Sequence, residues 1–312
     1  MLAILIGIVI GIGLPMQTSI NSRLKVAVGS PFVASLTSFT LGTIFLAIIT
    51  LIMDHSLLFS SKLFATQPIW LWIGGFLGVI YLTSNILLFP KLGSVQTVIF
   101  PILGQIIMGL AIDNFGLFDS IQKPLSLTRF FGALLVISGV VCAVAMDNII
   151  RKFHKTNLDE PKSSGLIIWR TLGIVAGMLG ASQTAINGHL GVVLKSSVKA
   201  AFISFLVGTI ALIVIVLILH PSIKLTTQNG KSNPWWMWIG GVIGALFVFG
   251  NAYLVPIIGT GLAVVIILVG QMTGSLLVDQ FGLLESNKNP VTPIQIVGIL
   301  IMIAGVALIR LF

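Results

Sequence analysis

Long apolar stretches alternate with short polar breaks along almost the whole chain. A helix needs roughly 20 apolar residues to cross a bilayer core of about 30 Å. Ten stretches meet that length, at about 2–22, 32–53, 69–89, 93–112, 129–147, 168–188, 199–219, 235–254, 261–279 and 293–311. Because helices satisfy their own backbone hydrogen bonds in lipid, the pattern predicts an all-α integral membrane protein with ten transmembrane helices.

The pattern of the first half returns in the second half at a constant displacement of 166 positions. The same residue types recur at matching positions of the two halves. The matching pairs are Gln17 with Gln183, Asn21 with Asn187, Trp72 with Trp238, Gly74 with Gly240, Gly75 with Gly241, Gly78 with Gly244, Asn85 with Asn251, Pro90 with Pro256, Gly93 with Gly259, Gln105 with Gln271, Asp113 with Asp279, Gly132 with Gly298 and Gly139 with Gly305. A displacement that stays constant over so many positions indicates a duplicated unit. We therefore expect a first five-helix repeat at 1–147, a hydrophilic linker at 148–165 and a second five-helix repeat at 166–312.

Five helices per repeat put the start of the second repeat on the side of the membrane where the first repeat ends. The second repeat is therefore predicted to be inverted, with an approximate two-fold axis in the membrane plane. Of the seventeen Lys and Arg residues, eleven lie on the predicted side of the linker and six on the other side. Because loops rich in Lys and Arg stay in the cytoplasm, this favours a cytoplasmic linker and external termini.

The composition agrees with a protein of the bilayer. The chain is 56% hydrophobic and 8% charged, whereas a soluble domain has roughly 25% charged residues. The net charge of +9 comes from Lys and Arg scattered through short loops, as membrane insertion requires. We find no basic face interleaved with aromatic residues, so we expect no nucleic-acid partner.

Two further features bear on processing and cofactors. The apolar N-terminal stretch has no charged leader and no small-x-small cleavage site, so we expect a retained helix and not a signal peptide. The one cysteine, Cys142, lies inside an apolar stretch. Neither a disulfide nor a Cys-based metal site is therefore expected, and we predict no cofactor.

Three short motifs occur in the same order in both halves. Gln-Thr-x-Ile-Asn stands near the end of each predicted first helix, at 17–21 and 183–187. Trp-x-Gly-Gly-x-x-Gly belongs to each third helix and Asp-x-Phe-Gly-Leu to the turn after each fourth helix. In this order the motifs resemble the YdcZ-type branch of the drug/metabolite transporter superfamily, a fused two-repeat form related to the small multidrug-resistance proteins.

The resemblance covers essentially the whole chain outside the linker. It implies ten helices in antiparallel halves, a multi-pass protein of a bacterial plasma membrane, and small solutes or drugs moved by alternating access. The small multidrug-resistance relatives carry a Glu in the middle of the first helix, which exchanges protons for cations. The first helices here have no carboxylate, so proton-coupled export of lipophilic cations is not expected.

The charged residues fall in predicted loops or at helix ends. All eight acidic residues do so. Of these, Asp113 and Asp279 remain candidate proton carriers, although an interfacial role at the helix end fits them better. Arg23 and its counterpart His189 are expected at the level of the lipid headgroups.

The uncharged polar residues of the apolar stretches are candidates for a substrate site, because polar side chains inside a bilayer usually face the bundle interior or a wet path. Gln17 and Asn21 are four residues apart and share a helix face, as do Gln183 and Asn187. Their amides suit a neutral or zwitterionic polar solute. Alternatively, they only bond neighbouring helices.

Three further pairs carry the same ambiguity. They are Asn85 with Asn251, Gln105 with Gln271, and Trp72 with Trp238. Each Gln follows a glycine, which favours a packing role as strongly as a binding role. The tryptophans suit either an aromatic belt at the membrane surface or stacking on a substrate.

Together these features predict a secondary transporter that moves a small polar or amphiphilic solute between the repeats. The chain has no Gly-rich nucleotide-binding loop, so ATP is not expected to drive it directly. The alternatives are a channel or a non-transporting membrane scaffold. A membrane enzyme is disfavoured, because the four histidines lie at predicted helix ends or in the linker and no carboxylates cluster. The expected partners are the solute and the lipid bilayer, and a homo-oligomer remains open.

Overall fold

The computed structural model describes residues 2–143, 164–221, 225–227, 232–258 and 260–311, which form helices and connecting turns without a strand. The first half contains α1 (Leu2–Val28), α2 (Pro31–Asp54), α3 (Lys62–Thr66), η1 (Ile69–Trp72), α4 (Gly74–Phe115), η2 (Leu117–Asp119) and α5 (Leu127–Val141). The second half contains α7 (Ser164–Leu194), α8 (Ser197–Leu219), η4 (Trp235–Trp238), α9 (Gly240–Ile258), α10 (Thr260–Phe281), η5 (Leu283–Glu285) and α11 (Pro293–Leu311). Of the described helices, six are long and apolar enough to cross a membrane, and shorter apolar helices occur in α5, α9 and α11.

The first helix of each half is longer than its apolar pattern predicts. α1 continues past residue 22 to Val28, and α7 continues past residue 188 to Leu194. Gly29, with φ 75°, ends α1 and donates its N–H to the carbonyl of Lys25 at 2.9 Å. The Gln-Thr-x-Ile-Asn motifs therefore lie inside the helices rather than near their ends.

The third and fourth predicted helices are joined through one glycine. α4 spans both, and its backbone leaves the helical region at Gly93, with φ 76° and ψ 175°. Only glycine adopts this conformation without strain. The part before Gly93 packs antiparallel to α7, since Gly74 and Gly78 contact residues 187 and 183. The part after it packs parallel to α7, since Pro101 contacts Gly177 and Gly104 contacts residues 174–178. The chain therefore reverses direction at Gly93.

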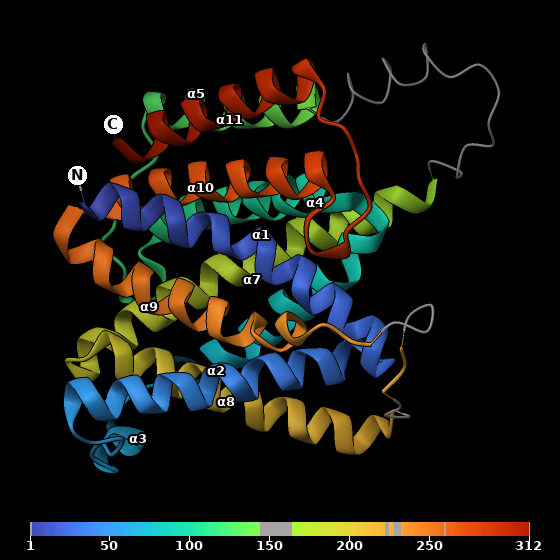
Figure 1. Cartoon of the computed structure of the whole chain (residues 1–312). Coiled ribbons are helices and arrows are strands. Elements are labelled where there is room, and N and C mark those ends of the chain that lie inside the picture. The colour runs from blue at the N-terminus through green and yellow to red at the C-terminus, as the bar shows by residue number, and fades with distance from the viewer. Residues whose placement is uncertain (1, 144–163, 222–224, 228–231, 259, 312) are drawn as a thin grey trace.

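The helices of the two halves interleave. In Figure 1 the pair α5 and α11 lies at one edge of the bundle, the pair α2 and α8 lies at the opposite edge, and the other long helices lie between. α1 packs against α9 and α10, whereas α7 packs against α4. The first helix of each half therefore fits against the third and fourth helices of the other half.

Glycines bring the backbones of the two halves together. A Cβ at Gly75 would overlap the carbonyl oxygen of Ser204, and a Cβ at its counterpart Gly241 would overlap the carbonyl oxygen of Ser38. α5 and α11 meet in the same way through Gly132 with Gly305 and Gly139 with Gly298. Close backbone approach through small residues is typical of helices that pack in a membrane.

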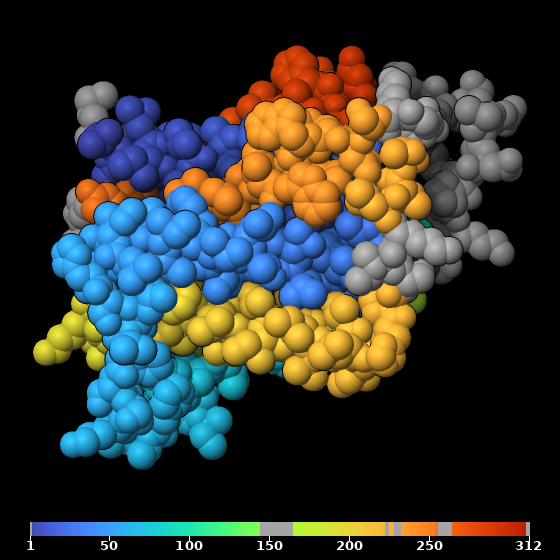
Figure 2. Space-filling model, turned by 60° about the horizontal axis from the view of Figure 1, so that its bottom comes forward, coloured from blue at the N-terminus to red at the C-terminus, as the bar shows by residue number. Residues whose placement is uncertain are grey.

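The outer face of α2 and α8 is apolar. The two helices lie beside each other on the face shown in Figure 2. Their exposed aliphatic side chains include Ile44, Ile48, Ile52, Ile210, Val214, Leu217 and Ile218. Such an extended apolar surface is unusual for a soluble monomer and suits contact with lipid tails.

We expect Gly177→Ala to destabilise the protein, because a Cβ at this position would overlap the carbonyl oxygen of Pro101. Overpacking of this kind costs about 1–3 kcal/mol. Gly188→Ala in the same helix is the matched control, since a Cβ there meets no atom of the described residues within 4 Å. Thermal unfolding of both variants in detergent is the measurement, and equal melting temperatures would contradict the packing argument.

Candidate functional site

The amides of α1 lie against glycines of α9. A Cβ at Gly244 would overlap the amide of Gln17, and a Cβ at Gly240 would overlap the amide of Asn21. Gln17 is 4% exposed and Asn21 is fully buried. The two glycines thus provide the space that the polar side chains of the other half occupy.

The counterpart amides of α7 make the equivalent contacts with α4. A Cβ at Gly78 would lie 2.5 Å from Nε2 of Gln183, and a Cβ at Gly74 would lie 2.5 Å from Oδ1 of Asn187. Gln183 and Asn187 are half-buried. Each half therefore contributes one glutamine and one asparagine to an interface with the third helix of the other half.

Several buried amide atoms in these interfaces have no hydrogen-bond partner among the described residues. They are Nδ2 and Oδ1 of Asn21, Oδ1 of Asn85 and Oδ1 of Asn187. Leaving such an atom unpaired costs about 1–3 kcal/mol. The cost disappears where water or a polar solute reaches the interface, so the contacts with protein alone do not account for these amides.

Gln105 belongs to the α4–α7 interface. Its Nε2 donates to the hydroxyl of Tyr81 at 3.3 Å, and the Tyr81 ring lies against Gly180 of α7. Asn85 stands one helical turn after Tyr81. Tyr81 was not among the predicted site residues, although a tyrosine within an apolar helix was a usable signal.

The remaining expected site residues are less closely connected. Gln271 is 4% exposed, and its backbone packs on Gly11 of α1. Asn251 is half-buried, two turns after Gly244 on α9. Gln271 therefore takes part in helix packing between the halves, as the glycine before it suggested.

The two tryptophans occupy 3₁₀ turns that precede the third helices. Trp72 packs with Phe59 and Phe64, with ring centroids 5.7 and 4.4 Å away. Trp238 is 38% exposed. The aromatic cluster around Trp72 gives that residue a structural role at the start of α4.

Equivalent ion pairs join the halves at the ends of the first helices. Nε of Arg23 lies 2.6 Å from Oε2 of Glu285, and Nε2 of His189 lies 3.5 Å from Oδ2 of Asp119. Arg23 is only 7% exposed and also donates to Oδ1 of Asn233 at 3.2 Å. η5 therefore brings a carboxylate to Arg23, a partner that the sequence did not indicate.

Asp279 has a structural partner that its sequence position does not reveal. It is 2% exposed and accepts the N–H groups of Ser94 at 2.8 Å and Val95 at 3.1 Å. These groups open the helix that restarts after Gly93, where a carboxylate is favoured. Its counterpart Asp113 is paired with the guanidinium of Arg129.

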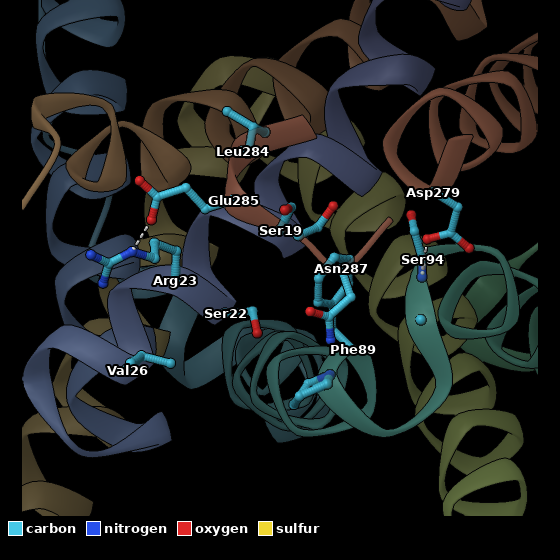
Figure 3. Close-up of a pocket in the computed structure, with 13 residues that line it drawn as sticks. Ser19, Ser22, Arg23, Val26, Phe89, Ser94, Asp279, Leu284, Glu285 and Asn287 are labelled. Atoms are coloured by element: carbon cyan, nitrogen blue, oxygen red, sulfur yellow. Dashed lines mark hydrogen bonds and ion pairs between the residues drawn. The ribbon is translucent and has the colours of Figure 1, made fainter. Parts of the chain in front are cut away.

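A pocket of about 200 Å³ lies between the end of α1, the break at Gly93 and the turn after α10 (Figure 3). Its polar lining includes Ser19, Ser22, Arg23, Ser94, Asp279, Glu285 and Asn287. None of these was expected to bind substrate. The usable signal was a departure from the repeat, since the counterparts of Ser19, Ser22 and Arg23 are Ala185, Gly188 and His189.

A protein-family model matches the chain twice. A family model described as that of a proposed inner membrane exporter, YdcZ, matches residues 2–142 and again residues 168–308. No curated protein matches the chain.

We expect Asp279→Asn to lower thermal stability, because an amide cannot accept both N–H groups at the start of the restarted helix. Hydrogen bonds to a charged group contribute about 1.5–3 kcal/mol. Asp119→Asn is the control, since Asp119 is 66% exposed in its pair with His189 and such pairs contribute about 0–1 kcal/mol. Melting temperatures in detergent measure both. An Asp279→Asn variant no less stable than Asp119→Asn would refute the capping role.

Proposed function

The chain belongs to the YdcZ family, and we propose that it is a secondary transporter that carries a small polar or amphiphilic solute by alternating access between two inverted repeats. The family match makes it a multi-pass membrane protein of an exporter kind. We further propose a bacterial plasma membrane as its location, with the linker at 148–165 in the cytoplasm.

The arrangement of helices supports ten crossings. The described chain has ten long helical segments when α4 is counted as two parts. They are α1, α2, the two parts of α4, α5, α7, α8, α9, α10 and α11. α1 and α7 run in opposite directions across the bundle (Figure 1). Opposite directions for counterpart helices are what two inverted repeats, at 1–147 and 166–312, require.

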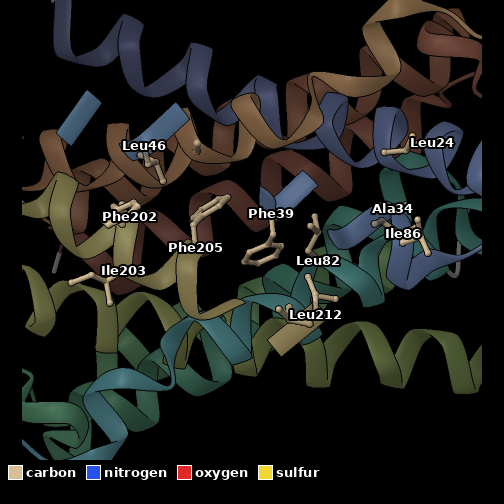
Figure 4. Close-up of a cluster of buried hydrophobic side chains, with 14 of the residues drawn as sticks. Leu24, Ala34, Phe39, Leu46, Leu82, Ile86, Phe202, Ile203, Phe205 and Leu212 are labelled. Carbon is tan, nitrogen blue, oxygen red and sulfur yellow. The ribbon is translucent and has the colours of Figure 1, made fainter. Parts of the chain in front are cut away.

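Contacts between residues and their own counterparts also support the inversion. Oγ1 of Thr43 lies 2.8 Å from Oγ1 of Thr209. The rings of Phe39 and Phe205, both labelled in Figure 4, have centroids 5.0 Å apart. A residue meets its own counterpart only near an axis that relates the halves, so these contacts favour a two-fold axis between α2 and α8.

The observation that carries the proposal is the set of unpaired amide atoms between the halves. Asn21 is fully buried and both polar atoms of its side chain lack a partner among the described residues. An amide that served only to bond helices would be expected to find a partner in the folded chain. A polar path along the first helices, open to water or solute in turn, gives these atoms a partner.

We expect Gln17→Ala combined with Gln183→Ala to impair transport while Gln122→Ala, on an exposed loop, does not. Each lost amide removes on the order of 1 kcal/mol of hydrogen bonding, so uptake should fall by about tenfold or more. The solute is first found by thermal-shift screening of the detergent-solubilised protein, since a ligand of the folded state raises its melting temperature. Counterflow in liposomes then measures transport.

Unchanged flux in the double variant would remove these amides from the path. Ohmic conductance in planar bilayers without saturable counterflow would favour a channel. Neither flux nor conductance would favour a scaffold.

We expect Gln122 and Lys288, which are counterparts on exposed loops, to face opposite sides of the membrane. Gln122→Cys and Lys288→Cys are made separately in a Cys142→Ser background. A membrane-impermeant maleimide should label one variant in right-side-out vesicles and the other in inside-out vesicles. Labelling of both from the same side would rule out inverted repeats.

A further inference from the structure

Three cations lie at the end of the bundle where α1 ends and α7 begins. Lys25 is near the end of α1, Lys91 is two residues before the break at Gly93, and Arg170 is in the second turn of α7. Lys25 and Lys91 are close enough for their charges to repel each other. Figure 1 shows these three parts of the chain on the same side of the bundle. Helices from both halves thus bring like charges together.

Two of the cations lie along the seam between α4 and α7. Nζ of Lys91 is 6.0 Å from the centroid of the Trp169 ring. Cζ of Arg170 is 5.6 Å from the centroid of the Phe100 ring, and its Nε donates to Oε1 of Gln96 at 3.4 Å. An aromatic ring attracts and orients a cation but carries no net charge. Both side chains are therefore positioned while their charges remain uncompensated by these neighbours.

The carboxylates at this end have other partners. Glu285 binds Arg23, and Asp279 accepts the N–H groups that open the helix after Gly93. Within the described ranges no carboxylate forms an ion pair with Lys25, Lys91 or Arg170. Nη1 and Nη2 of Arg170 likewise make no hydrogen bond to a described residue. Like charges held together in this way cost energy, and a bound anion would remove that cost.

The cations are not a requirement of the fold. The corresponding positions at the other end of the molecule carry Gly191, Ile257 and Ile4 in place of Lys25, Lys91 and Arg170. Membrane insertion calls for positive charges in the loops of one side. It does not call for cations within helices and against aromatic rings, where Lys91 and Arg170 lie. Neither packing nor insertion therefore explains this cluster.

Exposed aliphatic side chains border the cations. Ile167 and Ile168 precede Trp169 and Arg170 on α7, and both are exposed. Val26, next to Lys25, is exposed as well. Charge and apolar surface thus lie side by side, which suits a ligand that has an anionic head and hydrocarbon chains.

We propose that Lys25, Lys91 and Arg170 bind the headgroup of an anionic phospholipid in the leaflet on the side of the linker. The phosphodiester lies against the seam between α4 and α7, where Arg170 donates from its terminal nitrogens and the two lysines add attraction between charges. The acyl chains extend along Ile167 and Ile168. Basic sites between transmembrane helices on the cytoplasmic side are known to take anionic headgroups.

The charges and the apolar border favour this ligand over two simpler ones. A zwitterionic phospholipid would bring its own cation next to Lys25 and Lys91. A free phosphate would meet the cations but would leave the isoleucines without contact. Only a lipid with a net negative headgroup complements both parts of the site.

Matched probes test the assignment on the purified full chain in a neutral detergent. Dioctanoyl phosphatidylglycerol is the anionic lipid, and dioctanoyl phosphatidylcholine has the same chains and phosphodiester with an added cation. Dioctanoylglycerol has the chains alone, and glycerol 1-phosphate has the phosphate alone. The anionic lipid should raise the melting temperature saturably, and the other three should not at equal concentration. Absence of that shift, or an equal shift with any other probe, would overturn the proposal.

Variants locate the lipid on the cluster. Arg170→Gln and Lys91→Gln should each weaken the apparent affinity for dioctanoyl phosphatidylglycerol by about fivefold, as expected for one cation near an anionic lipid. Lys288→Gln is the control, since it removes one charge from an exposed loop on the same predicted side. Lys91→Arg keeps the charge at an exposed position and should keep the affinity, which separates lost binding from impaired folding. Equal weakening by Lys288→Gln would show a general effect of charge and refute the site.

The lipid site goes beyond the proposed transport function and is tested apart from it. Binding of phosphatidylglycerol that the cluster variants weaken, without counterflow of any solute in liposomes, would leave the site standing and refute the carrier. Counterflow of a solute, with no binding of the anionic lipid, would refute the site and leave the carrier standing.

Discussion

Close backbone contact between the two halves is the constraint on which the structure depends. Inside a bilayer, lipid tails are as apolar as leucine, so burial of apolar area does not by itself hold helices together, and packing must do so. Glycine supplies it wherever a Cβ would strike the other half, as at Gly75 against Ser204 and Gly177 against Pro101. The first helix of each half is thereby held against the third and fourth helices of the other, and the halves interleave.

The same contacts determine where polar groups can lie. Gly240 and Gly244 leave just the space that the amides of Asn21 and Gln17 fill, so the close packing and the candidate polar path are one feature. The packing explains the position of these side chains but not the unpaired state of the Asn21 amide among the described residues. An amide that only joined helices would be hydrogen-bonded to a protein group. The unpaired atoms of Asn21 therefore favour a path that water or solute can enter.

The sequence alone predicted the repeated helices, but not the contacts between residues that are far apart along the chain. The helices and the break at Gly93 follow from apolar length, glycine and proline, which are local properties. The Arg23–Glu285 pair and the contact of Asp279 with Ser94 join residues 262 and 185 positions apart, and no spacing rule indicates such partners. For the same reason α1 was expected to end before Arg23. The helix continues to Val28, and within it Arg23 binds Glu285 and Asn233.

In a duplicated chain the two halves can be compared with each other. Where their residues differ, the shared fold does not require either residue type. Two identical inverted halves would make the inward-open and outward-open states equal in energy by symmetry. Any difference in energy between these states must therefore come from positions where the two halves differ in sequence. One such difference lies at the ends of the first helices. Arg23 is permanently charged and binds Glu285 at one end, whereas the His189–Asp119 contact at the other end is an ion pair only when the imidazole is protonated. The two ends thus close with different strength, which would give the proposed carrier a preferred resting state, whereas the direction of net transport is set by the gradients.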